Sequence, residues 1–265
     1  MGEPTDQLPV TSSAPVKLPE AQETLFREVL LHLEEVRLPF AVSGAVALQQ
    51  HTGICRFTKD LDIFLSPADA NRALPILARQ GFECEIHDPV WLAKARRDGF
   101  FVDLITGMSN GAITVDAAWI RLSHPATVLG IKTRVLAPEE LIASKLFITR
   151  RERFDGADIV HVIYALAGRL DWPRILELAG EHWELVLWAL VLFRYVYPAQ
   201  THYVPQNVWQ DLLGRFANEV RSPDPKAKFR GSLIDDKMFA IDVEAWGLEN
   251  ILQETQAQRA KIEPV

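Results

Sequence analysis

The hydrophobic pattern divides the chain into two parts that differ in periodicity. Up to about residue 150, short apolar runs of strand length alternate with longer segments whose apolar residues have helical spacing. We expect helices at residues 19–36, 45–50, 67–80 and 138–148, and strands at residues 38–42, 61–65, 82–86, 100–105 and 128–137. After residue 150 the strong patterns are helical, at residues 158–167, 172–179, 183–197 and 208–220. This predicts an α+β fold in which a β-sheet flanked by helices precedes an all-helical C-terminal domain.

The same pattern sets the expected domain boundaries. Residues 1–17 are rich in Pro, Ser and Thr and carry few apolar side chains, which is typical of a mobile tail. Residues 18–150 then form the first folded domain, and residues 151–265 form the helical C-terminal domain. A linker-like loop is expected at residues 221–231.

Composition narrows the class of protein. The net charge of −7 over 265 residues argues against a broad surface that binds nucleic acid. The two cysteines, Cys55 and Cys84, are too few for a disulfide scaffold or a cysteine zinc site, and they suit a reducing compartment. The N-terminal residues contain no apolar run, and the apolar segment at 183–197 is too short to span a membrane. We therefore expect a cytoplasmic protein without a membrane segment.

Two carboxylates flank one apolar residue at the start of a predicted strand. Because side chains alternate along a strand, Asp60 and Asp62 point to the same face, and Leu61 points to the other. Two carboxylates on one face repel each other unless water or a cation separates them. Oxygen ligands of this kind suit Mg²⁺ or Mn²⁺. A solvated strand face would give the same pattern without a metal.

A third carboxylate, Asp103, lies inside the apolar strand expected at residues 100–105. A charged side chain in a buried strand is costly unless a partner compensates it. That partner is either a metal ion shared with the first two carboxylates or the guanidinium of Arg96 or Arg97.

A small-residue turn, Ser43-Gly44, stands between the strand at 38–42 and the following helix. Small residues let the backbone approach a phosphate, and the N-terminus of the helix offers free N–H groups to it. A simple strand exit with a helix N-cap explains the same two residues without a ligand.

The order of these motifs resembles the DNA polymerase beta-like nucleotidyltransferase superfamily. The stretch SGAVALQQHTGICRFTKDLDIFL, residues 43–65, is similar to the bacterial branch of AbiEii-type toxins and related uncharacterised nucleotidyltransferases. In that branch a small-residue turn, an Arg-x-Thr-x-Asp loop (here Arg56 to Asp60) and an Asp-x-Asp strand recur. The later stretch VLAPEELIASKLFITRRERFDGADIV resembles the same branch through Lys145, the arginines at 150–153, Asp155 and Asp158. The resemblance covers about residues 38–163.

The resemblance implies a fold, cofactors and a role for each candidate residue. The fold would be a nucleotidyltransferase-type mixed β-sheet flanked by helices, with residues 18–150 as the catalytic domain. Two Mg²⁺ or Mn²⁺ ions and an NTP co-substrate are implied, with Asp60, Asp62 and Asp103 as metal ligands and catalytic residues. Contacts to phosphate or substrate are implied for Ser43, Gly44, Arg56, Lys59 and Lys145. Taken alone, Lys145 also suits the solvated side of an amphipathic helix.

Three functions compete at this point. The first is a transferase that moves NMP from an NTP to a hydroxyl acceptor, which is a small molecule, an RNA 3′ end or a protein, with release of pyrophosphate. The second is a non-catalytic, antitoxin-like or degenerate module that binds a nucleotide or a partner. The turn reads Ser43-Gly44 where the superfamily prefers Gly-Ser or Gly-Gly, and this keeps the second function open. A metal-dependent phosphohydrolase ranks last. The resemblance also implies a cognate toxin or antitoxin protein as a partner.

Overall fold

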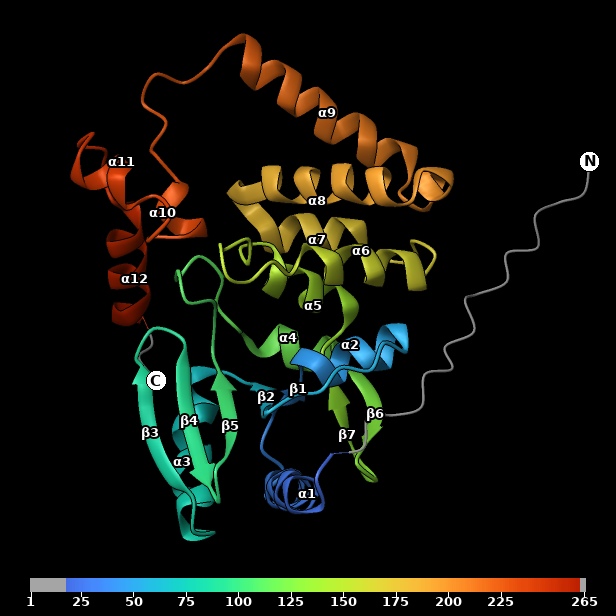
Figure 1. The fold of residues 1–265 in the computed structure, drawn as a ribbon, viewed down its shortest axis with the longest axis vertical. Coiled ribbons are helices and arrows are strands. Elements are labelled where there is room, and N and C mark those ends of the chain that lie inside the picture. The colour runs from blue at the N-terminus through green and yellow to red at the C-terminus, as the bar shows by residue number, and fades with distance from the viewer. Residues whose placement is uncertain (1–17, 263–265) are drawn as a thin grey trace, which may run out of the picture.

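The computed structural model describes residues 18–262 of the chain (Figure 1). The tail expected at residues 1–17 lies outside the described residues. Within them, a mixed α+β part is followed by a part made of helices, which confirms the predicted fold class. None of the helices between residues 18 and 262 is both long enough and apolar enough to cross a membrane.

The first part of the chain builds a seven-stranded mixed sheet with the strand order β3-β4-β5-β2-β1-β7-β6. Its elements are α1 (Glu20–Glu35), β1 (Ala41–Val42), α2 (Gly44–Thr52), β2 (Asp60–Phe64), α3 (Pro67–Arg79), β3 (Glu83–Asp88), β4 (Leu92–Arg97), β5 (Phe100–Ile105), α4 (Ala117–Leu122), β6 (His124–Val128), β7 (Ile131–Val135) and α5 (Pro138–Lys145). Strand β2 is central, because it pairs in parallel with β5 on one side and antiparallel with β1 on the other.

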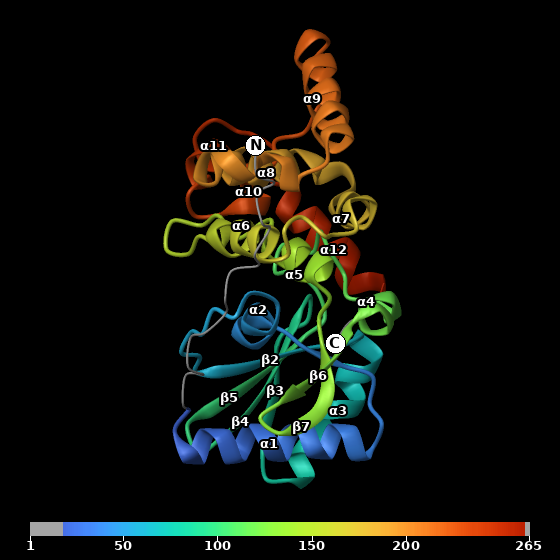
Figure 2. The ribbon, with the colours of Figure 1, turned by 90° about the vertical axis from the view of Figure 1, so that its right-hand side faces the viewer.

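Helices cover both faces of this sheet. On one face, α1 packs on α3 and on β7, and α3 packs on β3 and β4 (Figure 2). On the other face lies α2, which contacts α5 and α6. Alternation along β2 buries Leu61 and Ile63 completely on the α1 face. The same alternation leaves Asp60 and Asp62 on the α2 face, where they lie between the sheet and the helical part.

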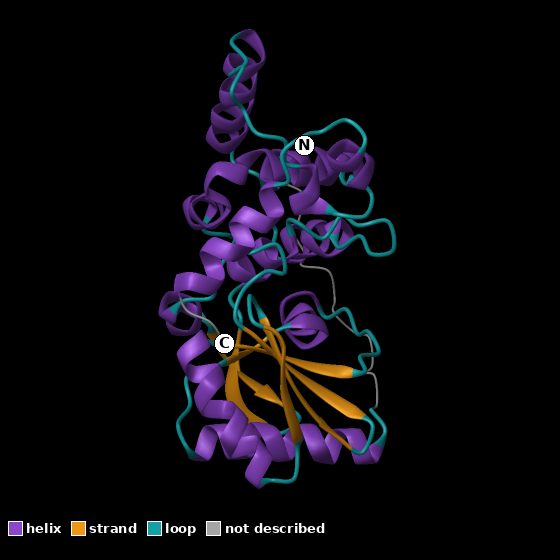
Figure 3. Cartoon of the chain, turned by 90° about the vertical axis from the view of Figure 1, so that its left-hand side faces the viewer, coloured by secondary structure: helices purple, strands orange, loops and turns teal. Residues whose placement is uncertain are grey.

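The second part of the chain is helical and stacks over α2. It comprises α6 (Gly156–Ala165), α7 (Trp172–Ala179), η1 (Gly180–His182), α8 (Trp183–Val196), η2 (Pro198–Tyr203), α9 (Gln206–Arg221), α10 (Gly231–Ile234), α11 (Ala240–Glu244) and α12 (Ile251–Ile262). The purple helices of this part form layers above the orange sheet in Figure 3. After α9 the chain turns back, so that α10 to α12 descend towards the end of the sheet that carries β3, β4 and β5 (Figure 1).

Some elements differ from those that the sequence pattern predicts. Strand β4 was not predicted, because Leu92-Ala-Lys-Ala-Arg-Arg mixes alanines with charged residues and contains no apolar run. The region expected as one strand at 128–137 holds the second arm of a hairpin, β7, and the end of the first arm, β6. Its turn residues, Leu129 and Gly130, both have positive φ, which is typical of a two-residue hairpin.

Candidate functional site

Sheet pairing brings the three predicted carboxylates together. In the parallel pair of β2 and β5, Asp62 lies directly opposite Asp103. Asp60 is on the same face of β2 as Asp62, because the two residues are two positions apart. All three line one cavity of about 400 Å³ between the sheet and the helical part. The carboxylates are thus neighbours, although 41 positions of sequence separate Asp62 from Asp103.

The central carboxylate of this group carries the strongest electrostatic perturbation. Burial raises the pKa of Asp62 to about 7, and the negative charges of Asp60 and Asp103 add to the effect. A carboxyl group in this position is unstable as an anion when its neighbours are ionised and no cation is near. The site is therefore an acidic pocket whose charge is incompletely balanced.

The small-residue turn lies directly over Asp62. The Ser43 amide donates a hydrogen bond to the Asp62 carbonyl oxygen over 2.9 Å, which ties the turn to β2. Gly44 begins α2 with a φ of +57°, a conformation that side chains disfavour. A Cβ atom at this position would also overlap the carboxyl group of Asp62. Glycine is thus required at residue 44 both by the backbone conformation and by the approach of the carboxylate.

A lysine that the sequence analysis did not single out contacts Asp103. Lys94 lies opposite Asp103 in the antiparallel pair of β4 and β5, and its Nζ donates to Asp103 Oδ1 at 2.9 Å and Oδ2 at 3.2 Å. Burial raises the pKa of Asp103, and the hydrogen bond from Lys94 works in the opposite direction. The alternative pairing of Asp103 with Arg96 or Arg97 is wrong.

Those two arginines point to other partners on the surface of the sheet. Arg96 forms an ion pair with Glu83 of the neighbouring strand, and Arg97 forms one with Glu28 of α1. The sequence pattern did not predict the role of Lys94. Its position opposite Asp103 depends on the pairing of β4 with β5, and the hydrophobic pattern does not predict β4.

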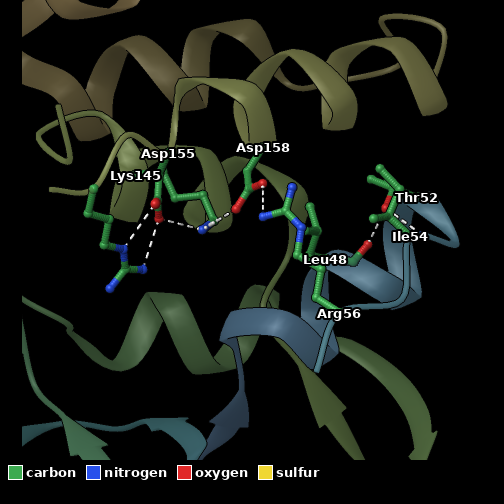
Figure 4. A network of polar contacts seen from close by, with 8 residues as sticks. Leu48, Thr52, Ile54, Arg56, Lys145, Asp155 and Asp158 are labelled. Atoms are coloured by element: carbon green, nitrogen blue, oxygen red, sulfur yellow. Dashed lines mark hydrogen bonds and ion pairs between the residues drawn. The ribbon is translucent and has the colours of Figure 1, made fainter. Parts of the chain in front are cut away.

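A network of charged side chains around the buried Lys145, Asp155 and Asp158 forms the roof of the cavity (Figure 4). Lys145, at the end of α5, lies 2.8 Å from Asp155 Oδ2 and 2.8 Å from Asp158 Oδ2. Arg153 pairs with Asp155, and Arg56, from the loop before β2, lies 2.5 Å from Asp158 Oδ1. The network therefore joins the sheet part to α6 directly above the carboxylates.

The network also sets the charge state of its members. Burial alone would raise the pKa of Asp155, but the hydrogen bonds from Arg153 and Lys145 outweigh it, so the pKa is lowered. Lys145 is almost fully buried, so the alternative that it lies on a solvated helix face is wrong. Lys59 is exposed and does not line the cavity, whereas Ser43, Gly44, Arg56 and Lys145 do.

The carboxylates of the cavity supply only part of the ligand shell that a divalent cation needs. Across residues 18–262, the structure contains no group of three or more His, Cys, Asp or Glu side chains arranged to hold a metal ion. The pair Asp60 and Asp62 nevertheless supplies oxygen ligands, and the repulsion that raises the Asp62 pKa would be relieved by a cation. Mg²⁺ is commonly bound through one or two carboxylates, with water and phosphate completing its shell. The two carboxylates of β2 fit that kind of site.

The fold and the acidic cavity beneath a glycine turn define the class of a nucleotidyltransferase. The sequence matches the model of a family described as uncharacterised nucleotidyltransferase over residues 26–193, so the chain belongs to this family. The matched range extends from α1 into α8 and includes every candidate residue of the cavity named so far. The narrower resemblance to the AbiEii-type branch stays a prediction. A comparison with curated proteins found no match.

Solved structures show more distant likenesses. A nucleotidyltransferase-like protein from Paracoccidioides brasiliensis is 17% identical, with 72% of this chain and 96% of that chain covered and a TM-score of 0.47. The antibiotic-resistance factor ANT(2'')-Ia is 18% identical, with 70% of this chain and 98% of that chain covered and a TM-score of 0.44. A nucleotidyltransferase from Thermotoga maritima is 16% identical, with 51% and 89% covered and a TM-score of 0.41. These likenesses are too distant to indicate a substrate.

Proposed function

We propose that the protein transfers a nucleoside monophosphate from an NTP to a hydroxyl acceptor and releases pyrophosphate. The observation that supports this most directly is the position of Asp60, Asp62 and Asp103 on adjacent strands beneath the N-terminus of α2. In the transfer, the acceptor oxygen forms a bond to the α-phosphorus. The bond from that phosphorus to the oxygen bridging to the β-phosphate breaks, and pyrophosphate leaves with the bond electrons.

The carboxylates of β2 would hold the divalent cation. In this proposal Asp60 and Asp62 are the ligands of Mg²⁺ or Mn²⁺, because both line the cavity and point to the same face. When bound, the cation neutralises the triphosphate and lowers the pKa of a hydroxyl near it. Asp103 is the carboxylate that receives the hydroxyl proton, since burial raises its pKa and thereby makes it a stronger base. Lys94 keeps it oriented.

The turn and the roof would bind the triphosphate. Ser43 and the backbone N–H of Gly44 stand at the start of α2, where free N–H groups favour an anion. Lys145 carries three N–H donors, of which two are directed at Asp155 and Asp158, so one remains for a phosphate oxygen. Arg56 is partly exposed and can donate towards the same groups. Lys59 has no part in the proposal because it does not line the cavity.

The test is incubation with each α-labelled NTP, Mg²⁺ or Mn²⁺, and separate pools of small molecules, RNA and protein. Pyrophosphate release together with label on a pool is the expected result. Asp62→Asn keeps the size of the side chain and should abolish both. Asp211→Asn on the exposed side of α9 is the matched control and should keep both. Full transfer by Asp62→Asn would refute the assignment of the site.

The same experiment separates the enzyme from a non-catalytic module. Calorimetry with NTP in the presence of Mg²⁺ measures binding independently of turnover. If the protein binds NTP but releases no pyrophosphate with any pool, the antitoxin-like or degenerate module is the better account. A cognate toxin or antitoxin partner stays a prediction of the family resemblance.

A further inference from the structure

The sheet order divides the cavity into two sides. Asp62 lies on β2, between β1 and β5. The turn that follows β1, with Ser43 and Gly44, lies on one side of it, and Asp103 of β5 lies on the other. If the turn binds the triphosphate, as proposed above, the hydroxyl acceptor must approach from the β5 side. The residues that enclose the β5 side therefore determine which acceptors fit.

The β5 side of the cavity has an apolar lining. Along the cavity face, Ile105 follows Asp103 on β5, and Phe64 follows Asp62 on β2. Met108, from the loop after β5, and Trp91, before β4, line the same cavity. Leu233 of α10 completes this lining, although it lies more than a hundred positions further along the chain. We call Trp91, Ile105, Met108 and Leu233 the acceptor wall.

Helices α10 and α12 hold the acceptor wall in place through contacts with the loop after β5. The Asn110 side chain donates to the Leu233 carbonyl oxygen over 2.9 Å. The Gln256 side chain of α12 donates to the Ser109 carbonyl oxygen over 2.7 Å. A Cβ atom at Gly111 would lie 3.2 Å from the backbone of residue 256, so the loop and α12 are in close contact.

The loop at residues 150–153, which also lines the cavity, contacts both the segment after α10 and the loop after β5. The Arg151 amide donates to Asp235 Oδ2 over 3.3 Å, directly after α10. Arg150 donates to the Ser109 hydroxyl over 2.7 Å. The residues that make these contacts from α10 to α12 lie beyond the range 26–193 that matches the family. Through these contacts the segment from α10 to α12 closes the acceptor side of the cavity.

The charges of the cavity do not suit a polyanionic acceptor. Five carboxylates and four cationic side chains line it. Of the cationic groups, Arg56, Lys145 and Arg153 are paired with Asp155 or Asp158. The fourth, Arg150, donates to Ser109. Carboxylates thus outnumber cationic side chains in the lining, and three of the four cations face carboxylates. Beyond the donors assigned to the triphosphate, the cavity offers little positive charge to the backbone phosphates of a nucleic-acid strand.

We propose that the acceptor wall selects a small, neutral or cationic molecule that carries its hydroxyl on a compact, largely apolar body. This inference rests on the proposed transfer of NMP, and it excludes an RNA 3′ end and a protein as the main acceptor. Leu233 is a specificity-determining residue of that reaction. Asn110 and Gln256 are positioning residues, because their side chains hydrogen-bond to the backbone of Leu233 and of Ser109 and so hold the wall in place.

The experiment compares variants of Leu233 with variants of its neighbour Ile234, which is half-buried on α10 but does not line the cavity. The probes are α-labelled NTP with Mg²⁺, the small-molecule filtrate of a bacterial extract, its total RNA and its protein fraction. The expected result is that wild-type protein labels components of the filtrate. Leu233→Trp should lower that labelling by roughly tenfold or more, because the larger side chain fills the space beside the acceptor wall. Calorimetric binding of NTP with Mg²⁺ should stay unchanged.

Variants with a smaller side chain test the inference if tryptophan at residue 233 disturbs folding. Leu233→Ala should extend labelling to larger components of the filtrate, and Ile234→Ala should leave the labelled set unchanged. Label on RNA or on protein instead of the filtrate would overturn the inference while the proposed transferase stands. So would unchanged filtrate labelling by a folded Leu233→Trp variant. If wild type binds no NTP and releases no pyrophosphate, the proposed function fails and the inference falls with it.

Discussion

Gly44 lies so close to Asp62 that a Cβ atom at residue 44 would overlap the Asp62 carboxyl group. We predict that Gly44→Ala abolishes transfer, because either the turn or the carboxylate must move. A displacement of this kind costs roughly a hundredfold in rate or more. The measurement is kcat/KM for NTP with thermal melting as the check on folding.

The matched control for this substitution is Gly99→Ala. Gly99 also has a positive φ, of 80°, but its Cβ would meet no atom within 4 Å. Alanine at residue 99 is therefore strained by a positive φ without overlapping another atom. If both variants lose activity equally, strain and not the contact with Asp62 is the cause.

The ion pair of Lys94 and Asp103 makes a second prediction. Lys94→Met leaves the buried carboxyl group of Asp103 without its hydrogen-bond partner. We expect kcat to fall roughly tenfold to a hundredfold, because a positioned base is worth about 10²- to 10⁴-fold and Lys94 supplies only its orientation. The affinity for NTP, measured by calorimetry, should change little.

Arg96→Met is the control on the same strand, since Arg96 pairs with the exposed Glu83. Lys94→Arg should recover part of the lost rate by restoring a donor to Asp103. Equal losses of kcat and of NTP affinity in Lys94→Met would contradict a positioning role.

The raised pKa of Asp62 predicts how stability depends on pH when metal is removed. In the folded protein the pKa is about 7, compared with 3.8 as its ordinary value, so the unfolded chain loses this proton first. Between about pH 4 and pH 7 the folded state binds more protons than the unfolded state. The contribution of Asp62 to the free energy of unfolding therefore falls as pH rises through this range, by about 1.4 kcal/mol per pH unit.

Urea unfolding in the presence of a chelator measures this dependence. Asp62→Asn lacks the titrating group and should remove that part of the pH dependence. Adding Mg²⁺ at neutral pH should stabilise wild type and leave Asp62→Asn unaffected, because a cation compensates the ionised carboxylates. Identical pH profiles of the two proteins would refute the assigned pKa.

The buried position of Lys145 predicts that the protein is less stable without its ammonium group. Its ammonium group balances Asp155 and Asp158 inside the roof of the cavity. Lys145→Ala leaves these buried charges uncompensated on that side, and we expect a loss of about 3–5 kcal/mol in the free energy of unfolding. Lys228→Ala breaks a surface pair with Glu254 and is the control, with no measurable loss expected. A stable Lys145→Ala variant would show that water or rearrangement replaces the ammonium group.

The sequence was sufficient to predict those features that depend on local pattern. Alternation along β2 places Asp60 and Asp62 on one face without any knowledge of the neighbours. That Asp103 lies opposite Asp62 depends on the strand order, which the pattern does not contain, and the family resemblance was needed to expect it. Lys94 was missed for the same reason, since β4 has no apolar run to reveal it.

The C-terminal segment was beyond prediction for a different reason. Helices α10 and α11 have four and five residues, too few for a helical period to be visible. Leu233 is one leucine in a polar stretch, and its place in the cavity depends on a long-range hydrogen bond that its carbonyl oxygen accepts from Asn110, in the loop after β5. Such contacts depend on the tertiary fold, so the pattern of neighbouring residues in the sequence does not predict them.

The ion pair of Arg56 and Asp158 crosses the boundary at which the hydrophobic pattern changes. The cavity itself does so as well, because Ile148 and Arg150 line it before that boundary and Arg153 lines it after. A gene split near residue 150 would therefore place half of one site on each fragment. Neither fragment alone should turn over NTP. Co-expression of the two should restore activity to the extent that they bind each other, so recovered turnover would report fragment association.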